Sequence, residues 1–426
     1  MQTGSFSQII ATSKIRRNPR LAVRAALLGV ALLALGTLTA AAEETAPAVA
    51  PPVPAPAPAP APAPVPVPFP QAVSNAANTV LTAAVTAGTA QQPIVIDPLI
   101  DGVTGAQTRA TDNIQNQITS LVEQRYPQFV VKKFSTESLG VQPYVLIGTF
   151  TPINSDGKTA GTREAYRFCL VMADLKSGKI VAKGVARAQL TDVDDTPLPV
   201  FADSPGWSED AATQGYISTC QASKVGDPIN KTYLDGIITA ATIGQAIEAY
   251  DSGRYADALH LYNDAAQTPA GDQLRVYNGI YLTSFRLRQR DLSQKFERLL
   301  DYGYRRGRLA LKILFSPGTA SFEYRSKFSS QYAAWLNQIA RKEGQGTTCL
   351  EVVGHTSATG SAALNDRLAE LRAQYVKNRL DAIAPQIRTR TSARGAGSSE
   401  MLVGTGKDDE SDALDRRVEF KLKPSC

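Results

Sequence analysis

A tract of alternating proline and small residues divides the chain and limits where a packed domain can form. Residues 45–70 hold twelve prolines, most of them in Ala-Pro repeats. Proline has no backbone N–H to donate, so the tract favours polyproline II over helix or sheet. At about 3.1 Å per residue, it could extend on the order of 80 Å as a semi-rigid spacer. We therefore expect residues 43–92 to be a disordered linker, with the packed domains after it.

A basic and then apolar segment precedes the tract. Its positive charges come from Lys14, Arg16, Arg17, Arg20 and Arg24. The apolar run of residues 25–42 ends in Ala40-Ala41-Ala42, an A-x-A cleavage site. This order is typical of a secretory signal peptide, so we expect residues 1–42 to be removed on export. The alternative is an uncleaved inner-membrane anchor, because about 18 apolar residues can just span a bilayer.

The formal charge of +6 is concentrated in this segment. Without its five basic residues, 40 basic and 39 acidic residues remain. A chain so close to neutral lacks the basic surface that nucleic-acid binding requires, and that class of function is excluded.

Four cysteines follow the tract, at positions 169, 220, 349 and 426. In an exported protein an even number favours disulfides, and four cysteines allow three connectivities. We favour Cys169–Cys220 and Cys349–Cys426, because each pair then stays within one proposed domain. Free buried thiols are the alternative. A metal site is less favoured, since there is no C-x₂-C pair and the chain has two histidines.

Residues 93–225 alternate between helical and strand periodicity. Ile114, Ile118 and Val122 share one face of a helix predicted over 108–125. Strands are predicted at 129–134, 144–150, 166–172 and 180–190, with a hairpin turn at 176–179. The pattern predicts a small N-terminal α+β sandwich.

Residues 240–305 read as helices. Their small and aromatic residues resemble the spacing of tetratricopeptide (TPR) repeats, at Gly253, Tyr255, Ala258, Tyr262, Ala265 and Pro269. A second unit begins near Leu274, and two units are fewer than the roughly three that an independent solenoid needs. The TPR-like segment must therefore pack against a neighbouring domain. It serves either as a partner-binding platform or as a structural bridge.

The C-terminal region carries a spaced motif. It runs through Gly354-His355-Thr356-Ser357, Gly360, Asn365, Leu368, Arg372-Ala373 and Asp415-Arg416-Arg417-Val418. The motif resembles the OmpA-like C-terminal domain family over residues 309–426. That resemblance implies a βαβαβ domain, with strands at 311–315, 350–353, 388–393 and 417–422 and helices at 328–339 and 364–380. The whole chain is then a multidomain α+β protein.

The resemblance also implies a ligand. Domains of this family bind peptidoglycan through the diaminopimelate residue of its stem peptide, with a loop Asp on the amino group and a helix Arg on the carboxylate. A guanidinium pairs with a carboxylate through two parallel hydrogen bonds, which suits the second role. The implied peptidoglycan-binding residues are Arg372, Ser357, Thr356, Asn365 and Arg416.

Ser357 departs from the family pattern, which has Asp at this position. A hydroxyl offers no charge, so we expect binding to be weakened roughly tenfold. Asp366 is near in sequence but lies on a different helix face. Asp415 replaces the usual Asn, and the loop 403–412 lacks the family's Asn. The alternative role for Arg372 is a surface ion pair with Glu351 or Asp415.

No catalytic arrangement is evident. His355 occupies a framework position of the motif, and His260 reads as solvated. We predict a periplasmic envelope protein, associated with the cell wall or outer membrane, that is not an enzyme and needs no cofactor. It would bind peptidoglycan through the OmpA-like domain and protein partners through the central domains. The alternative is an interaction scaffold whose OmpA-like domain has lost wall binding. Whether the chain forms a homodimer stays open.

Overall fold

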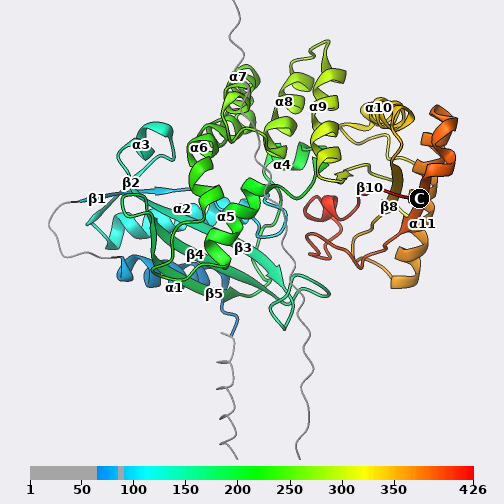
Figure 1. Ribbon diagram of the computed structural model, residues 1–426. Coiled ribbons are helices and arrows are strands. Elements are labelled where there is room, and N and C mark those ends of the chain that lie inside the picture. Colours follow the sequence, from blue (N-terminus) through cyan, green and yellow to red (C-terminus); the bar gives the residue numbers. More distant parts are fainter. Residues whose placement is uncertain (1–64, 85–90) are drawn as a thin grey trace, which may run out of the picture. The chain divides into compact units, whose positions relative to one another are not determined.

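The structure is a computed structural model that describes residues 65–84 and 91–426 (Figure 1). The predicted signal peptide and most of the proline tract lie outside these residues. The described chain combines helices with two mixed β-sheets. Within the described ranges, none of the helices is both long enough and apolar enough to cross a bilayer.

The first sheet has the strand order β2-β1-β3-β4-β5. Strand β1 runs parallel to both of its neighbours, while β3, β4 and β5 form an antiparallel meander. The elements of this region are α1 (Phe69–Ala83), β1 (Gln92–Ile96), α2 (Arg109–Arg125), β2 (Phe129–Lys132), α3 (Thr136–Gly140), β3 (Tyr144–Ile153), β4 (Ala165–Asp174), β5 (Lys179–Ala188), α4 (Pro199–Asp203), β6 (Gly206–Trp207) and α5 (Ala211–Gln221). The predicted helix and strands of this region are present, with shifted ends.

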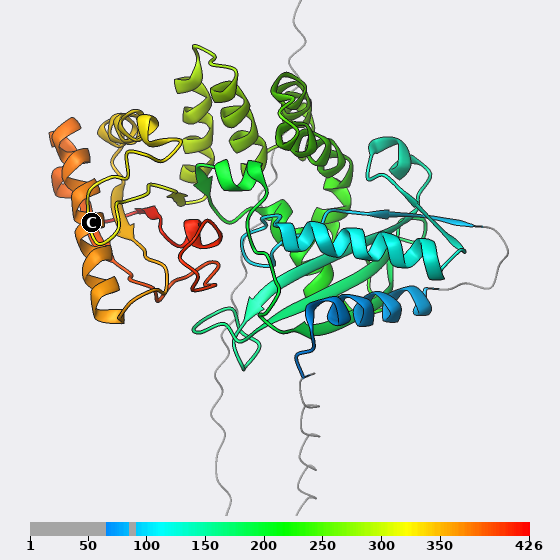
Figure 2. The same cartoon turned by 180° about the vertical axis from the view of Figure 1, so that it is seen from behind.

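Helix α1 corrects the predicted linker, which was expected to continue to residue 92. Together with α2 it covers one face of the first sheet (Figure 2). Its Phe69, Val73 and Val80 are buried, and its alanines allow the helix backbone to approach the sheet closely. A Cβ built on Gly184 of β5 would lie 2.4 Å from the carbonyl oxygen of Ala76. The small residues that suggested disorder are thus a packing face.

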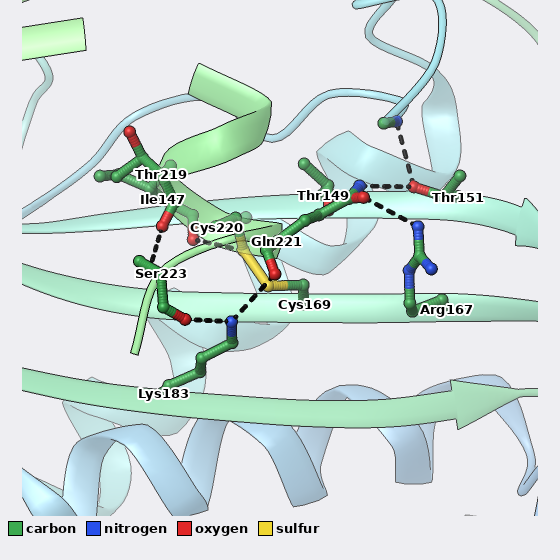
Figure 3. The surroundings of a disulfide bond; sticks show 12 residues. Ile147, Thr149, Thr151, Arg167, Cys169, Lys183, Thr219, Cys220, Gln221 and Ser223 are labelled. Atoms are coloured by element: carbon green, nitrogen blue, oxygen red, sulfur yellow. Dashed lines mark hydrogen bonds between the residues drawn. A yellow bond between two sulfur atoms is a disulfide. The ribbon is translucent and has the colours of Figure 1, made fainter. Parts of the chain in front are cut away.

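The two predicted disulfides are both present. Cys169–Cys220 joins β4 to α5, which covers the opposite face of the first sheet (Figure 3). Beside it, the Nζ of Lys183 donates to the carbonyl oxygen of Ser223 at 2.6 Å and thereby holds the chain after α5 against β5. Cys349–Cys426 joins the start of β8 (Cys349–Gly354) to residue 426.

Four helices follow, and their core continues into the second sheet. They are α6 (Lys231–Asp251), α7 (Tyr255–Gln267), α8 (Leu274–Arg286) and α9 (Leu292–Arg305). Trp335 of α10 (Tyr332–Gln345) stacks on Phe296 of α9 with ring centroids 5.4 Å apart, and its Nε1 donates to the Tyr281 hydroxyl at 2.8 Å. This shared core agrees with the expectation that the segment packs against a neighbour. Its assignment as TPR-like stays a prediction.

The second sheet has the order β6-β7-β10-β8-β9, with β8 and β9 parallel and the other pairs antiparallel. Its edge strand β6 comes from within the predicted N-terminal domain, so that segment crosses to the C-terminal sheet. The C-terminal elements are β7 (Arg308–Leu311), η1 (Ser329–Gln331), α10 (Tyr332–Gln345), β8 (Cys349–Gly354), α11 (Ala362–Ile383), η2 (Pro385–Arg390), β9 (Thr391–Gly395), η3 (Ser411–Leu414) and β10 (Val418–Lys423).

The four predicted C-terminal strands are present, and two of them differ from the predicted bounds by more than one residue. The first ends at Leu311 rather than residue 315, and Phe315 instead forms an isolated bridge with Phe322. The strand predicted from residue 388 begins at Thr391, because Pro385 opens a 3₁₀ helix through Arg390.

The close approach at Gly184 predicts that Gly184→Ala will loosen α1. The added Cβ meets the Ala76 carbonyl oxygen, and such overpacking costs about 1–3 kcal/mol. Amide exchange over residues 69–83 should accelerate about tenfold, which mass spectrometry can measure. The matched control is Gly140→Ala, where a Cβ meets nothing within 4 Å. Equal exchange in the two variants would contradict the docking of α1.

Candidate functional site

Arg372 lies on α11 with its side chain buried beneath the segment after β7. The residue is 7% exposed. Its Nε donates to the carbonyl oxygen of Thr319 at 3.1 Å, and its guanidinium carbon lies 5.0 Å from the ring centroid of Phe315. Within the described residues, its two Nη atoms make no hydrogen bond or ion pair. The buried guanidinium is therefore aligned by its neighbours while its terminal amino groups remain free.

The ion pairs that the sequence offered as an alternative role for Arg372 do not form. Glu351 contacts the Nζ of Lys423 at 2.8 Å, and Asp415 accepts hydrogen bonds from backbone groups. Burial lowers the pKa of Arg372, and the nearby charge of Arg416 lowers it further, whereas the carboxylate of Asp408 raises it. Arg372, Arg416 and Asp408 thus act on one another electrostatically.

Ser357 is buried and contacts a carboxylate that is not part of the predicted site. Its Oγ donates to Oδ1 of Asp408 at 2.6 Å, and Nη1 of Arg416 lies 2.8 Å from the same oxygen. Asp408 opens the acidic run Asp408-Asp409-Glu410. That run was the available signal, because it lies in the loop already noted for lacking the family's Asn.

Two buried carboxylates hold the loop that carries Asp408. Asp415 accepts the backbone N–H groups of Leu402, Val403 and Gly404 at 2.6, 3.0 and 2.7 Å. Asp412 accepts from the backbone N–H of Thr405 at 2.9 Å and from that of Asp408 at 3.2 Å. Burial raises the pKa of Asp415, and its backbone hydrogen bonds oppose that rise. Asp415, expected as a motif departure, is therefore a framework residue.

The first region of the chain also contacts this loop. Nζ of Lys407 donates to the carbonyl oxygen of Val193 and to Oδ2 of Asp195, both at 3.1 Å. Nε of Arg163 donates to the carbonyl oxygen of Val403 at 3.2 Å. The loop beside the C-terminal motif is therefore fixed from two sides.

The other predicted site residues shape the loop after β8. Nδ2 of Asn365 donates to the carbonyl oxygen of Thr359 at 3.2 Å. The backbone N–H of Thr356 donates to the carbonyl oxygen of Gly397 at 2.9 Å, while its buried hydroxyl has no hydrogen-bond partner among the described residues. Asp366, considered as a substitute anion, lies against Gly397, and in the described part of the chain it forms no hydrogen bond with Ser357, whose hydroxyl donates to Asp408.

His355 lies beneath the site in a buried ionic network. Its Nε2 is 3.2 Å from Oε2 of Glu419, and Nε of Arg308 donates to the other Glu419 oxygen at 2.7 Å. Burial pushes the pKa of Glu419 upward, but the hydrogen bond to His355 and the charges of Arg308 and Arg417 lower it to about 2. Burial lowers the pKa of His355, which favours neutral imidazole.

The same network contains the group of side chains best placed for metal binding in the described part of the chain. Ligand atoms of His355, Glu400 and Glu419 lie within 4.8 Å of one another. Lys421 and Arg308 already pair with Glu419, with Lys421 Nζ at 3.4 Å. A further cation would be repelled by these groups, so the arrangement fits an internal ion-pair network better than a metal site.

Comparison with known proteins points to the C-terminal region. No protein-family model and no curated protein matches the sequence. Similar solved structures include the periplasmic domain of MotB, at 18% identity over 28% of this chain and 64% of that domain, with a TM-score of 0.24. The chain therefore spans less than two thirds of that domain.

Two further structures match a similar share of the chain. They are the cell wall anchor of the type VI secretion system from Pseudomonas aeruginosa (24% identity, 28% of this chain, 81% of that chain, TM-score 0.23) and the peptidoglycan-associated lipoprotein from Burkholderia pseudomallei (23%, 26%, 88%, 0.23). Such low TM-scores carry no argument about function, which must come from the site itself.

The ionic network predicts a pH-dependent effect of Glu419→Gln. Because the pKa of Glu419 is lower in the folded than in the unfolded chain, its ionisation stabilises the fold above pH 4.5, and this stability is lost as the pH falls toward 2. Denaturant unfolding at pH 7 should show a loss on the order of 3 kcal/mol. The difference from wild type should shrink between about pH 4.5 and pH 2. A difference independent of pH would contradict the assigned ionisation.

The loop contacts predict that Asp415→Ala will destabilise the protein. The substitution leaves three backbone N–H groups without their acceptor. Unpaired buried donors cost about 1–3 kcal/mol each, so the free energy of unfolding should fall by about 3 kcal/mol or more. Asp366→Ala, at an exposed position on α11, is the control and should change it by less than about 0.5 kcal/mol. Similar unfolding curves for the two variants would rule out this role for Asp415.

Proposed function

We propose that this protein is a periplasmic envelope protein that binds peptidoglycan non-covalently through the site around Arg372. One observation carries the proposal. Arg372 is buried and held by Thr319 and Phe315, yet its two Nη atoms have no partner within the described residues. Neither Nη atom is a fully buried atom without a partner, so both reach the surface, where a ligand anion can pair with them. The motif around it resembles that of OmpA-like peptidoglycan-binding domains.

The chemistry of Arg372 favours a carboxylate ligand. The two free Nη atoms can donate parallel hydrogen bonds to the two oxygens of a carboxylate. Because the guanidinium is already aligned, binding needs little loss of side-chain freedom. In the proposed complex, the carboxylate belongs to the diaminopimelate residue of the stem peptide. The role is binding, with no catalytic step.

The rest of the chain would then join the wall to other envelope components. We propose that the first region and the helices α6–α9 contact protein partners. The second candidate function is a scaffold that has lost wall binding. Its support is the internal pairing of Asp408 with Ser357 and Arg416, which partly satisfies the site without a ligand.

Co-sedimentation of the full exported chain with purified sacculi tests the proposal. Wild type should pellet with sacculi, and Arg372→Ala should weaken binding about tenfold or more, because a charge-assisted contact is lost. Arg372→Lys should also weaken it, since an ammonium cannot donate two parallel hydrogen bonds.

The matched control is Arg367→Ala. Arg367 is an exposed arginine on the same helix and makes no hydrogen bond or ion pair within the described residues. The Arg367→Ala variant should pellet with sacculi as wild type does. If wild type itself stays in solution, wall binding is overturned and the scaffold function is favoured. If Arg372→Ala and Arg367→Ala lose binding equally, the protein binds sacculi by general electrostatic attraction rather than through a defined site.

A further inference from the structure

We propose that Asp408, in the loop between β9 and β10, provides the anion that receives the ammonium group of the ligand, in place of an acid at position 357. This inference rests on the proposed function and names a second binding residue of the same site. The recognised group would be an α-amino acid end, with its carboxylate on Arg372 and its ammonium on Asp408.

The carboxylate of Asp408 has one oxygen engaged and one free. Its Oδ1 accepts from Ser357 at 2.6 Å and contacts Arg416 at 2.8 Å. The carboxylate is thus ion-paired with Arg416, but its Oδ2 accepts no hydrogen bond within the described residues, and the side chain is 46% exposed. Ser357 and Arg416 therefore orient the carboxylate and leave its second oxygen open to a ligand.

The backbone conformation of Asp408 also fixes the position of its side chain. Its φ is +57°, a left-handed conformation that Asp and Asn adopt more readily than most residues. Its backbone N–H donates to the buried carboxylate of Asp412 at 3.2 Å. A residue held in a sparsely populated conformation by a buried acceptor is positioned before any ligand arrives.

Arg372 and Asp408 belong to one site. Ser357 donates to Asp408 at 2.6 Å, which places Asp408 at the loop that leads from β8 into α11, the helix of Arg372. The charge of Asp408 also acts to raise the pKa of Arg372, although the opposite effects of burial and Arg416 are larger. An amino acid end group presents an ammonium and a carboxylate a few ångströms apart. Arg372 supplies a cation and Asp408 an anion, and each has hydrogen-bonding atoms that no described residue uses. Such a pair matches a zwitterion.

This arrangement also explains the Ser at position 357. With Asp408 present, an Asp at 357 would bring two carboxylates to hydrogen-bond distance, and both could not stay ionised. The hydroxyl instead donates to Asp408. Ser357 and Asp408 thus form a matched pair, in which the negative charge has moved from the loop after β8 to the loop before β10.

The test is a charge exchange in the full exported chain, measured by co-sedimentation with sacculi. Asp408→Asn removes the charge while keeping an acceptor and a residue type that tolerates positive φ. Binding should weaken about tenfold, the difference between a charged and a neutral hydrogen bond. The double variant Ser357→Asp with Asp408→Asn returns one carboxylate to the pair and should recover most of the loss. Asp366→Asn is the matched control and should bind like wild type.

Sacculi whose free amino groups have been acetylated provide a second readout. Acetylation removes the ammonium, so wild-type binding should fall about tenfold, while Asp408→Asn should lose little more. Thermal unfolding of each variant, expected to match wild type, shows that lost binding is not lost folding.

The results separate this inference from the proposed function. If wild type binds and Arg372→Ala does not, but Asp408→Asn binds like wild type, then wall binding stands and the role of Asp408 is overturned. The role is also overturned if acetylation weakens wild type and Asp408→Asn equally, or if Ser357→Asp alone strengthens binding. A wild type that does not pellet overturns both.

Discussion

The site depends on two buried carboxylates that accept backbone N–H groups along one loop. Asp415 accepts from residues 402–404, and Asp412 accepts from Thr405 and Asp408. Without these acceptors, five backbone N–H groups of the loop would lose their hydrogen bonds, including that of Asp408, which has a positive φ. Because buried N–H groups must be paired, the two acids convert an irregular segment into a defined one.

That loop connects regions far apart in the sequence. Lys407 reaches Val193 and Asp195, and Arg163 reaches Val403, so the first region helps to hold a segment beside the C-terminal motif. The helices α6–α9 share an apolar core with the second sheet, and β6 forms its edge. The packing of the first region and the position of the loop that carries Asp408 are therefore linked by direct contacts.

Parts of this architecture were predictable because local rules determine them. The cysteine pairing follows from the proximity of each pair within one segment. The face that α11 buries does not follow from its leucines, because Leu364 and Leu371 are exposed while Asn365 and Arg372 are buried. Helix α1 was missed because its alanines and small polar residues resemble the linker before it. These small residues pack only because Gly184 of β5 has no side chain, which lets the backbone of α1 approach the sheet closely. The early end of β7 was missed because Phe315 forms a bridge with Phe322, and the periodicity of the sequence does not predict that contact.

The candidate site divides in the same way. The sequence by itself determined that residue 357 carries no charge, and it placed Arg372 two turns after Asn365 on one helix. The ligand role of Arg372 came from the resemblance to the OmpA-like family and stays a prediction. The sequence did not determine where the negative charge lies. Asp408 is 51 residues from Ser357, and only the tertiary structure, through the hydrogen bonds of Asp412 and Asp415, brings them together. The physical reason is that the conformation of a loop depends on the buried groups that accept hydrogen bonds from its backbone. Local sequence patterns do not show which groups these are.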